Sequence, residues 1–182
     1  MNTPAVILTN PKFPHNVGAA LRACAALGAR QLYVTGNRAQ WEVTGKGSRL
    51  PREERMKQYK DEVELIRTDR PFDHFTDAVP IAIEVDPTAE PLATFELSYI
   101  DDNGQPVYLH PDKAVYVFGP EDGGVPKVFR GLCHRFVILP SDHCLNLATA
   151  VTWTLGDRRV KRQQAGLEPI LPAYATIQEE RG

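Results

Sequence analysis

The sequence contains no long apolar run and no segment that resembles a targeting signal. Its 182 residues are 42% hydrophobic and 24% charged, as in globular proteins, and no run approaches the roughly 20 apolar residues of a membrane span. Met1 leads directly into a short apolar run at residues 5–8, without the apolar core of a signal peptide. We therefore expect a cytoplasmic chain of about one domain that does not associate with membranes.

Cysteine is also scarce. Only Cys24, Cys133 and Cys144 are present, an odd number with no C-x-x-C pair, which argues against a disulfide framework and predicts reduced thiols. Two of them stand next to a histidine, His134 or His143, but zinc ligands are usually separated by two to four residues. The sequence thus predicts no metal site.

A strong net charge is missing as well, because 21 Lys and Arg residues are balanced by 23 Asp and Glu residues. Positive charge is nevertheless concentrated in two places, with six Lys or Arg against two Glu at residues 46–60 and the run RRVKR at residues 158–162. Each cluster by itself is typical of a solvated helical face. Together, on a mildly acidic chain, they also fit a local anionic partner.

Short apolar runs alternate with helix-like stretches along the chain. Helical patterns occupy residues 16–29 and a long segment from residue 146 to residue 164. The apolar runs predict strands at residues 5–8, 31–34, 81–85, 114–119 and 136–140. Because nearly continuous apolar strands with intervening helices are typical of a parallel sheet covered on both faces, the sequence predicts an α/β fold.

The first helical stretch carries clear boundary signals. Asn16 is a favourable N-cap and Gly28 a favourable C-terminal stop. Residues at helical spacing between them predict a buried face, formed by Val17, Ala20, Leu21, Cys24 and Leu27. Gly18 and Arg22 lie one turn apart, and the missing side chain at Gly18 leaves the guanidinium an open route to the start of the helix.

Residues 86–113 are rich in turn signals and are predicted to form an insertion on the core fold. The sequence DDNG at residues 101–104 predicts a hairpin, because Asn-Gly is a strong turn signal, although the nearby Pro106 weakens strand pairing. After Gly166 the chain contains Pro169 and Pro172, so it cannot continue as one long helix.

The glycine-rich stretch VFGPEDGGVP at residues 117–126 is neither of the common phosphate-binding loops. It lacks the G-x-G-x-x-G spacing of dinucleotide sites and the lysine of a P-loop, and Glu121 and Asp122 would repel a phosphate. The strand end before Gly119 still suits a ligand, because small molecules bind outside the carboxyl ends of parallel strands. We expect a ligand with polar donors or positive charge, such as a nucleoside with a cationic or amino-acid part.

A third segment, FVILPSDHCLNLATAV at residues 136–151, has the order strand, proline, polar turn and helix. Asn146 stands where the helix begins, so it either caps the helix or serves a site. Together with NPKFPHNVGAALRACAALGA at residues 10–29 and the glycine-rich stretch, this segment resembles, in order and spacing, the three motifs of the SPOUT superfamily of RNA methyltransferases. The match is to its TrmH-like 2′-O-ribose branch.

This resemblance covers most of the chain and implies both a fold and an activity. It implies a parallel sheet flanked by helices with a deep C-terminal trefoil knot, in a domain of residues 1–165 followed by a tail of residues 166–182. The implied reaction transfers a methyl group from S-adenosylmethionine to a ribose 2′-hydroxyl of RNA, with tRNA preferred over rRNA. Similar proteins are dimers with the pocket near the subunit interface, so a homodimer is expected.

By position, the resemblance also assigns roles to individual residues. The catalytic group would consist of Asn16, Arg22, Glu121 and Asn146. The cofactor pocket would be lined by Ile83, Gly119, Leu139, Cys144, Leu145 and Leu147. Arg22 would clamp a phosphate beside the target ribose, and further RNA contacts are expected in the first basic cluster, from Lys46, Arg49 and Arg52. Cys144 replaces a serine common in the family, which weakens any side-chain hydrogen bond there.

Three alternatives remain open from the sequence. One is a knotted RNA-binding protein that has lost its affinity for the cofactor. A second is a base methyltransferase on the same fold, which would need a carboxylate base rather than an Asn and Arg pair. A third is an unrelated nucleotide-binding α/β enzyme without a knot.

Overall fold

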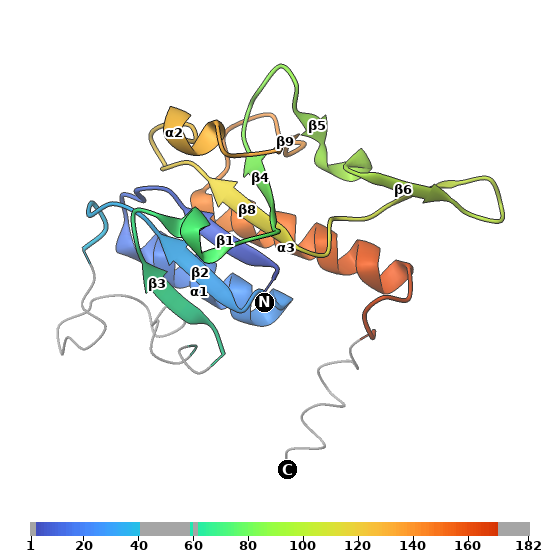
Figure 1. Ribbon diagram of the computed structural model, residues 1–182, viewed down its shortest axis with the longest axis horizontal. Coiled ribbons are helices and arrows are strands. Elements are labelled where there is room, and N and C mark those ends of the chain that lie inside the picture. Colours follow the sequence, from blue (N-terminus) through green and yellow to red (C-terminus); the bar gives the residue numbers. More distant parts are fainter. Residues whose placement is uncertain (1–2, 41–58, 60–61, 171–182) are drawn as a thin grey trace, which may run out of the picture.

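Seven parallel strands form the central sheet of the protein, in the order β3-β2-β1-β8-β4-β9-β5. The computed structural model describes residues 3–40, 59 and 62–170 (Figure 1). The strands are β1 (Ala5–Leu8), β2 (Gln31–Val34), β3 (Glu64–Arg67), β4 (Val79–Ile83), β5 (Glu90–Pro91), β8 (Ala114–Phe118) and β9 (Arg135–Ile138). The predicted α/β class is therefore confirmed.

All five predicted strands are present, and two short strands were missed. β4 ends at Ile83, two residues earlier than predicted, whereas β3 and β5 lie at the two edges of the sheet. β3 has exposed residues at both ends, and β5 consists of only two residues, Glu90 and Pro91. Edge strands lack the continuous apolar run of a central strand, and this is why sequence periodicity did not show them.

The central strands are buried on both faces. On β1, Val6 and Leu8 join the larger core beneath the long helices, while Ala5 and Ile7 point to the opposite face. That second face is covered by two short helices, η3 (Pro71–His74) and α2 (Lys127–Arg130), which contribute Phe72 and Phe129. Complete burial of each large apolar side chain contributes about 1.5–3 kcal/mol.

The first long helix, α1 (Pro14–Leu27), begins two residues before the predicted start. Its N-cap is Phe13, and Pro14 takes the first helical position, where its fixed backbone angle suits the helix and its missing N–H is not needed. Asn16 was predicted to be the N-cap, and that prediction is wrong. The predicted stop is confirmed, because Gly28 adopts the left-handed conformation with φ of 87°.

The last long helix, α3 (Leu147–Gln164), packs against α1 on one face of the sheet (Figure 1). Asn146 is its N-cap, and its side chain accepts hydrogen bonds from the amides of Ala148 (2.9 Å) and Thr149 (3.4 Å). The predicted capping role of Asn146 is thus confirmed. No helix among the described residues is both long enough and apolar enough to cross a bilayer.

The predicted hairpin is present in the insertion. β6 (Leu97–Ile100) and β7 (Pro106–Tyr108) pair in antiparallel fashion and project away from the sheet (Figure 1). In the turn, the Asp101 side chain accepts hydrogen bonds from the amides of Asn103 and Gln105, and Gly104 has φ of 76°. A short helix, η4 (Leu92–Thr94), precedes the hairpin.

A buried polar chain joins the end of the insertion to α3. The hydroxyl of Tyr116 on β8 donates to Nδ1 of His110 (2.6 Å), and Nε2 of His110 donates to Asp157 (2.8 Å), which also binds Lys161 (2.8 Å). Burial lowers the pKa of His110 below its ordinary value, although the hydrogen bond that His110 donates to Asp157 opposes the shift. His110 is therefore neutral near pH 7 and connects a donor, the Tyr116 hydroxyl, with an acceptor, the Asp157 carboxylate.

Acidification should destabilise the protein through His110. Unfolded histidine has a pKa of about 6.5, and the pKa of folded His110 lies lower, so the unfolded state takes up the proton first as the pH falls. Stability should decrease below about pH 6.5, by up to about 1.4 kcal/mol per pH unit. Urea unfolding between pH 7.5 and pH 5 measures this slope. The slope should be smaller in His110→Gln and unchanged in His134→Gln, which alters an exposed histidine; equal slopes in all three proteins would contradict the assignment.

Candidate active site

Three segments that are far apart in sequence meet at the carboxyl edge of the sheet. The side-chain amide of Asn146 donates to the amide oxygen of Asn16 (2.9 Å), and the amide nitrogen of Asn16 donates to Glu121 (2.6 Å). Since a carboxylate can only accept, Glu121 fixes the orientation of the Asn16 amide, and Asn16 in turn fixes that of Asn146. The structure therefore brings together three of the four residues predicted to be catalytic.

Glu121 is anchored at the N-terminus of α1. Its carboxylate accepts hydrogen bonds from the amides of Lys12 (2.6 Å) and Phe13 (3.2 Å) in addition to the bond from Asn16. Burial raises the pKa of this carboxyl, but the hydrogen bonds from Asn16 and the two amides lower it by more. The pKa of Glu121 therefore lies below its ordinary value. A carboxylate at this position also interacts favourably with the helix dipole.

A pocket of about 400 Å³ opens beside the Asn16 and Asn146 side chains. The lining residues come from the first two turns of α1 and α3 and from the N-cap of α3, and they are His15, Asn16, Ala19, Asn146, Ala148, Thr149 and Thr152. Sequence reasoning had missed His15, Thr149 and Thr152. The spacing of His15 and Ala19, one helical turn apart beside Asn16, is the signal that could have identified this face.

Arg22, the fourth predicted catalytic residue, does not join this network. It is exposed on α1, and within the described part of the chain it forms no hydrogen bond or ion pair. His15, Ala19 and Arg22 are separated by four and three residues, so they lie along one stripe of the helix. Arg22 thus stands one turn beyond the pocket, and no described side chain holds its guanidinium.

The glycine-rich loop is held by a residue that sequence reasoning missed. The carboxylate of Glu84, directly after β4, accepts hydrogen bonds from the amides of Val125 (2.5 Å) and Val85 (2.9 Å). A Cβ at Gly119 would lie 2.6 Å from the backbone carbon of Gly124. The missing side chain at Gly119 therefore allows two parts of the loop to pack together, and its contact with a cofactor stays a prediction.

The remaining residues assigned to the cofactor surround the same edge of the sheet. Ile83 ends β4, Leu139 follows β9, and both are half-buried apolar side chains, as is Leu145, so they suit an adenosine group. Within the described residues, Cys144 and Leu145 form no hydrogen bond with protein atoms, so their amides are available to a ligand. Leu147 differs, because its side chain is buried in the core. The donor groups and apolar surfaces fit S-adenosylmethionine.

The structure describes only the second of the two basic clusters predicted from the sequence. Lys46, Arg49 and Arg52 lie outside the described residues. In the second cluster, Lys161 binds Asp157 (2.8 Å) and the carbonyl of Leu92 (2.6 Å). Its neighbours Arg158 and Arg162 are paired with carboxylates and have side chains no more than 14% exposed. The interpretation of residues 158–162 as a solvated helical face is therefore wrong for these three side chains.

The cysteines are free thiols, as predicted. Burial raises the pKa of Cys24 and Cys133 to about 12, so both stay protonated, whereas Cys144 is exposed beside the candidate site. Among the described residues no group of three or more His, Cys, Asp or Glu side chains is arranged to hold a metal ion.

Comparisons with known proteins agree with the observed fold. The chain is similar in fold to the TrmH/SpoU tRNA modifying enzyme of A. aeolicus, with a TM-score of 0.65 and 18% identity over 97% of this chain and 85% of that one. It is also similar to the SpoU methyltransferase AviRb from Streptomyces viridochromogenes in complex with AdoMet, with a TM-score of 0.62 and 23% identity over 91% of this chain and 62% of that one. The chain therefore spans less than two thirds of the length of AviRb.

A third structure, which concerns the 2-OH methylation of C/U34 on tRNA, has a TM-score of 0.61 and 20% identity over 86% of this chain and 89% of that one. No curated protein sequence matches the chain. The model of the SpoU rRNA methylase family, in contrast, matches residues 3–155. Because this match covers well over half of the chain, the protein belongs to the SpoU rRNA methylase family.

Proposed function

We propose that the protein transfers a methyl group from S-adenosylmethionine to a ribose 2′-hydroxyl of RNA. The observation that carries this proposal is the chain of hydrogen bonds from Asn146 through Asn16 to Glu121, beside a pocket at the carboxyl edge of the sheet. It brings the three motifs together in one place. The family membership and the cofactor-bound relative AviRb support the same conclusion.

The bound cofactor would supply an electrophilic methyl group on a sulfonium, held by the strand ends and by the amides of Cys144 and Leu145. The transfer would break the bond between the methyl group and the sulfonium, release S-adenosylhomocysteine, and give the proton of the 2′-hydroxyl to solvent water. The residues of the chain would bind and orient the RNA. Arg22 binds a phosphate next to the target nucleotide and stabilises negative charge developing on the 2′-oxygen. Asn16 and Asn146 hold the pocket wall in one orientation, so that the oxygen stays in line with the methyl carbon.

Glu121 acts as a positioning residue in this proposal rather than as a base. Its carboxylate already accepts three hydrogen bonds, and its pKa lies below the ordinary value, so it is a poor proton acceptor. A base methyltransferase would need a free carboxylate at this place. The geometry therefore favours the ribose hydroxyl over a base nitrogen as the methyl acceptor.

RNA is the proposed partner, and tRNA the preferred substrate. One similar fold belongs to a structure concerned with methylation of tRNA at C/U34, and another to a tRNA modifying enzyme. The isolated position of Arg22 on the surface leaves it accessible to an RNA phosphate. We also assign RNA contacts to Lys46, Arg49 and Arg52, in a cytoplasmic enzyme whose catalytic domain spans residues 1–165 and contains the trefoil knot.

We further infer that two copies associate through an exposed face of α3. Trp153 and Val160 on α3 are seven residues apart, so they share one helix face, and both are exposed, by 39% and 51%. Trp153 is one turn from Thr149 of the pocket. Sedimentation equilibrium should give twice the chain mass of 20.3 kDa, and Trp153→Glu should shift the protein to the monomer. A monomeric wild-type protein would contradict this interface.

Two measurements test the proposed activity itself. Calorimetry with S-adenosylmethionine should show binding, and transfer of labelled methyl groups to RNA should depend on both RNA and protein. A protein that binds RNA but neither binds nor uses the cofactor would instead be the non-catalytic knotted RNA-binding protein.

A further inference from the structure

A second pocket, of about 350 Å³, lies away from the candidate active site. Its lining residues come from the amino ends of strands and the C-terminal halves of the two long helices, and they are Thr3, Pro4, Leu27, Gly28, Asp112, Arg158, Arg162 and Glu168. Thr3 precedes β1 and Asp112 precedes β8, so the pocket opens at the edge of the sheet opposite Asn146. Along α3, Arg158 is about 18 Å from Asn146 at roughly 1.5 Å per residue.

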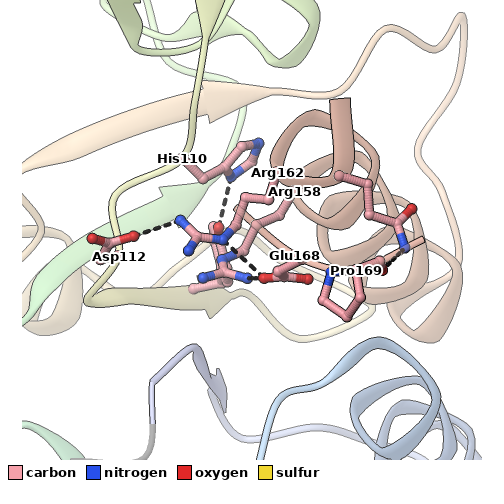
Figure 2. A network of polar contacts seen from close by, with 8 residues as sticks. His110, Asp112, Arg158, Arg162, Glu168 and Pro169 are labelled. Carbon is pink, nitrogen blue, oxygen red and sulfur yellow. Dashed lines mark hydrogen bonds and ion pairs between the residues drawn. The ribbon is translucent and has the colours of Figure 1, made fainter. Parts of the chain in front are cut away.

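Two guanidinium groups in this pocket share a single carboxylate oxygen. Oε1 of Glu168 accepts a hydrogen bond from Nη1 of Arg158 (3.0 Å) and another from Nε of Arg162 (2.8 Å), as Figure 2 shows. Arg162 also binds Asp112 (2.5 Å), whose side chain is 80% exposed. Glu168 comes from the segment that turns back after Gly166 at the end of α3, so the carboxylate reaches the arginines from a loop.

The carboxylate does not satisfy the donors of the pocket. Arg158 is only 5% exposed, and its buried Nε has no hydrogen-bond partner among the described residues. An unpaired buried donor costs about 1–3 kcal/mol, and more when it belongs to a charged group. A tetrahedral phosphate offers more acceptor oxygens than one carboxylate oxygen, so it can meet both guanidinium groups and also the free Nε–H.

We propose that this pocket binds a phosphate group and that Glu168 is an internal anion that the phosphate displaces. Asp112, the other carboxylate that lines the pocket, is 80% exposed and bound to Arg162. Asp157 is already bound to Lys161 and His110, and Arg159 adds a further cation near Gly28. The phosphate comes either from the RNA backbone or from a free phosphate compound. Binding of inorganic phosphate requires no methyl transfer, so this site can exist even if the proposed function fails.

Calorimetric titration with inorganic phosphate in chloride buffer of constant ionic strength tests the site. Glu168→Gln removes the competing charge and should bind phosphate at least about threefold more tightly than the wild type. Arg162→Gln should lose the binding. The matched control is Glu90→Gln, which alters another glutamate paired with an arginine, Arg135, and should bind like the wild type.

The phosphate affinities of the wild type and Glu168→Gln test the proposed displacement even if an arginine variant unfolds, which circular dichroism would show. Equal phosphate affinity in these two proteins, or binding to neither, would overturn the proposal and leave Glu168 as a structural clamp. Measurement of RNA binding by the same variants shows whether the phosphate belongs to RNA or to a free compound. If the phosphate belongs to RNA, Arg162→Gln should weaken RNA binding. The slope of the logarithm of the RNA-binding constant against the logarithm of the salt concentration should become shallower by about 0.7–0.9. If it is a free compound, RNA binding stays unchanged while phosphate binding is lost.

Discussion

Replacement of Arg22 by alanine is expected to slow RNA methylation by about 10²- to 10³-fold, the loss typical of a group that stabilises charge in the transition state. Arg22 has no partner within the described residues and is exposed, so its removal should leave the fold and the affinity for S-adenosylmethionine unchanged. Single-turnover methylation rates and calorimetry with the cofactor measure the two quantities separately.

Arg30→Ala is the matched control for this prediction. Arg30 is also exposed and follows α1, but its guanidinium bonds to the carbonyl of Glu62 (3.4 Å) on the far side from the pocket. It should retain the wild-type rate. Arg22→Lys keeps the charge but loses the bidentate geometry, so an intermediate rate is expected. A fully active Arg22→Ala protein would remove this residue from the mechanism.

Glu121→Gln should reduce both stability and the rate of methyl transfer. Glutamine has nearly the same size, but one of its terminal groups donates hydrogen bonds, so it cannot accept those of Asn16, Lys12 and Phe13 together. Leaving one of these donors unpaired costs about 1–3 kcal/mol, which urea unfolding measures. Because Glu121 acts through Asn16, we expect kcat to fall more than the KM for the cofactor rises.

Asp122→Asn is the matched control in the same loop. Asp122 is an exposed carboxylate that binds Arg38 (2.6 Å) at the surface, and this partner lowers its pKa to about 2. Surface ion pairs of this kind contribute little to stability. Asp122→Asn should therefore remain near wild type in stability and rate. If the two variants behave alike, the hydrogen bonds of Glu121 have no special importance for the site.

Local sequence patterns were sufficient for much of the fold. Continuous apolar runs identified the central strands, Gly28 ended α1, and Asn146 began α3, because each signal depends only on nearby residues. The start of α1 was mispredicted, since Pro14 and Asn16 are both good helix-start residues and only the carboxylate of Glu121, more than 100 positions away, shows which function Asn16 has.

Long-range pairing explains the other differences as well. The run at residues 158–162 is basic in sequence, but one of its charges, Arg162, pairs with Asp112, 50 residues away. The carboxylates of Asp157 and Glu168 are close in sequence, and only the fold shows that they pair with Lys161 and Arg158. Glu84 fell inside the strand predicted at residues 81–85, and its contact with the loop at Val125 follows only from the packing of β4 beside β8.

The position of the transferred methyl group tests the central claim most directly. RNA incubated with the protein and S-adenosylmethionine is digested to nucleosides, and mass spectrometry then shows whether the methyl group is on the sugar or on the base. We predict a 2′-O-methylated nucleoside that appears with the wild-type protein and is nearly absent with Arg22→Ala. A methyl group on a base, or no methylated product with any RNA, would contradict the proposed reaction.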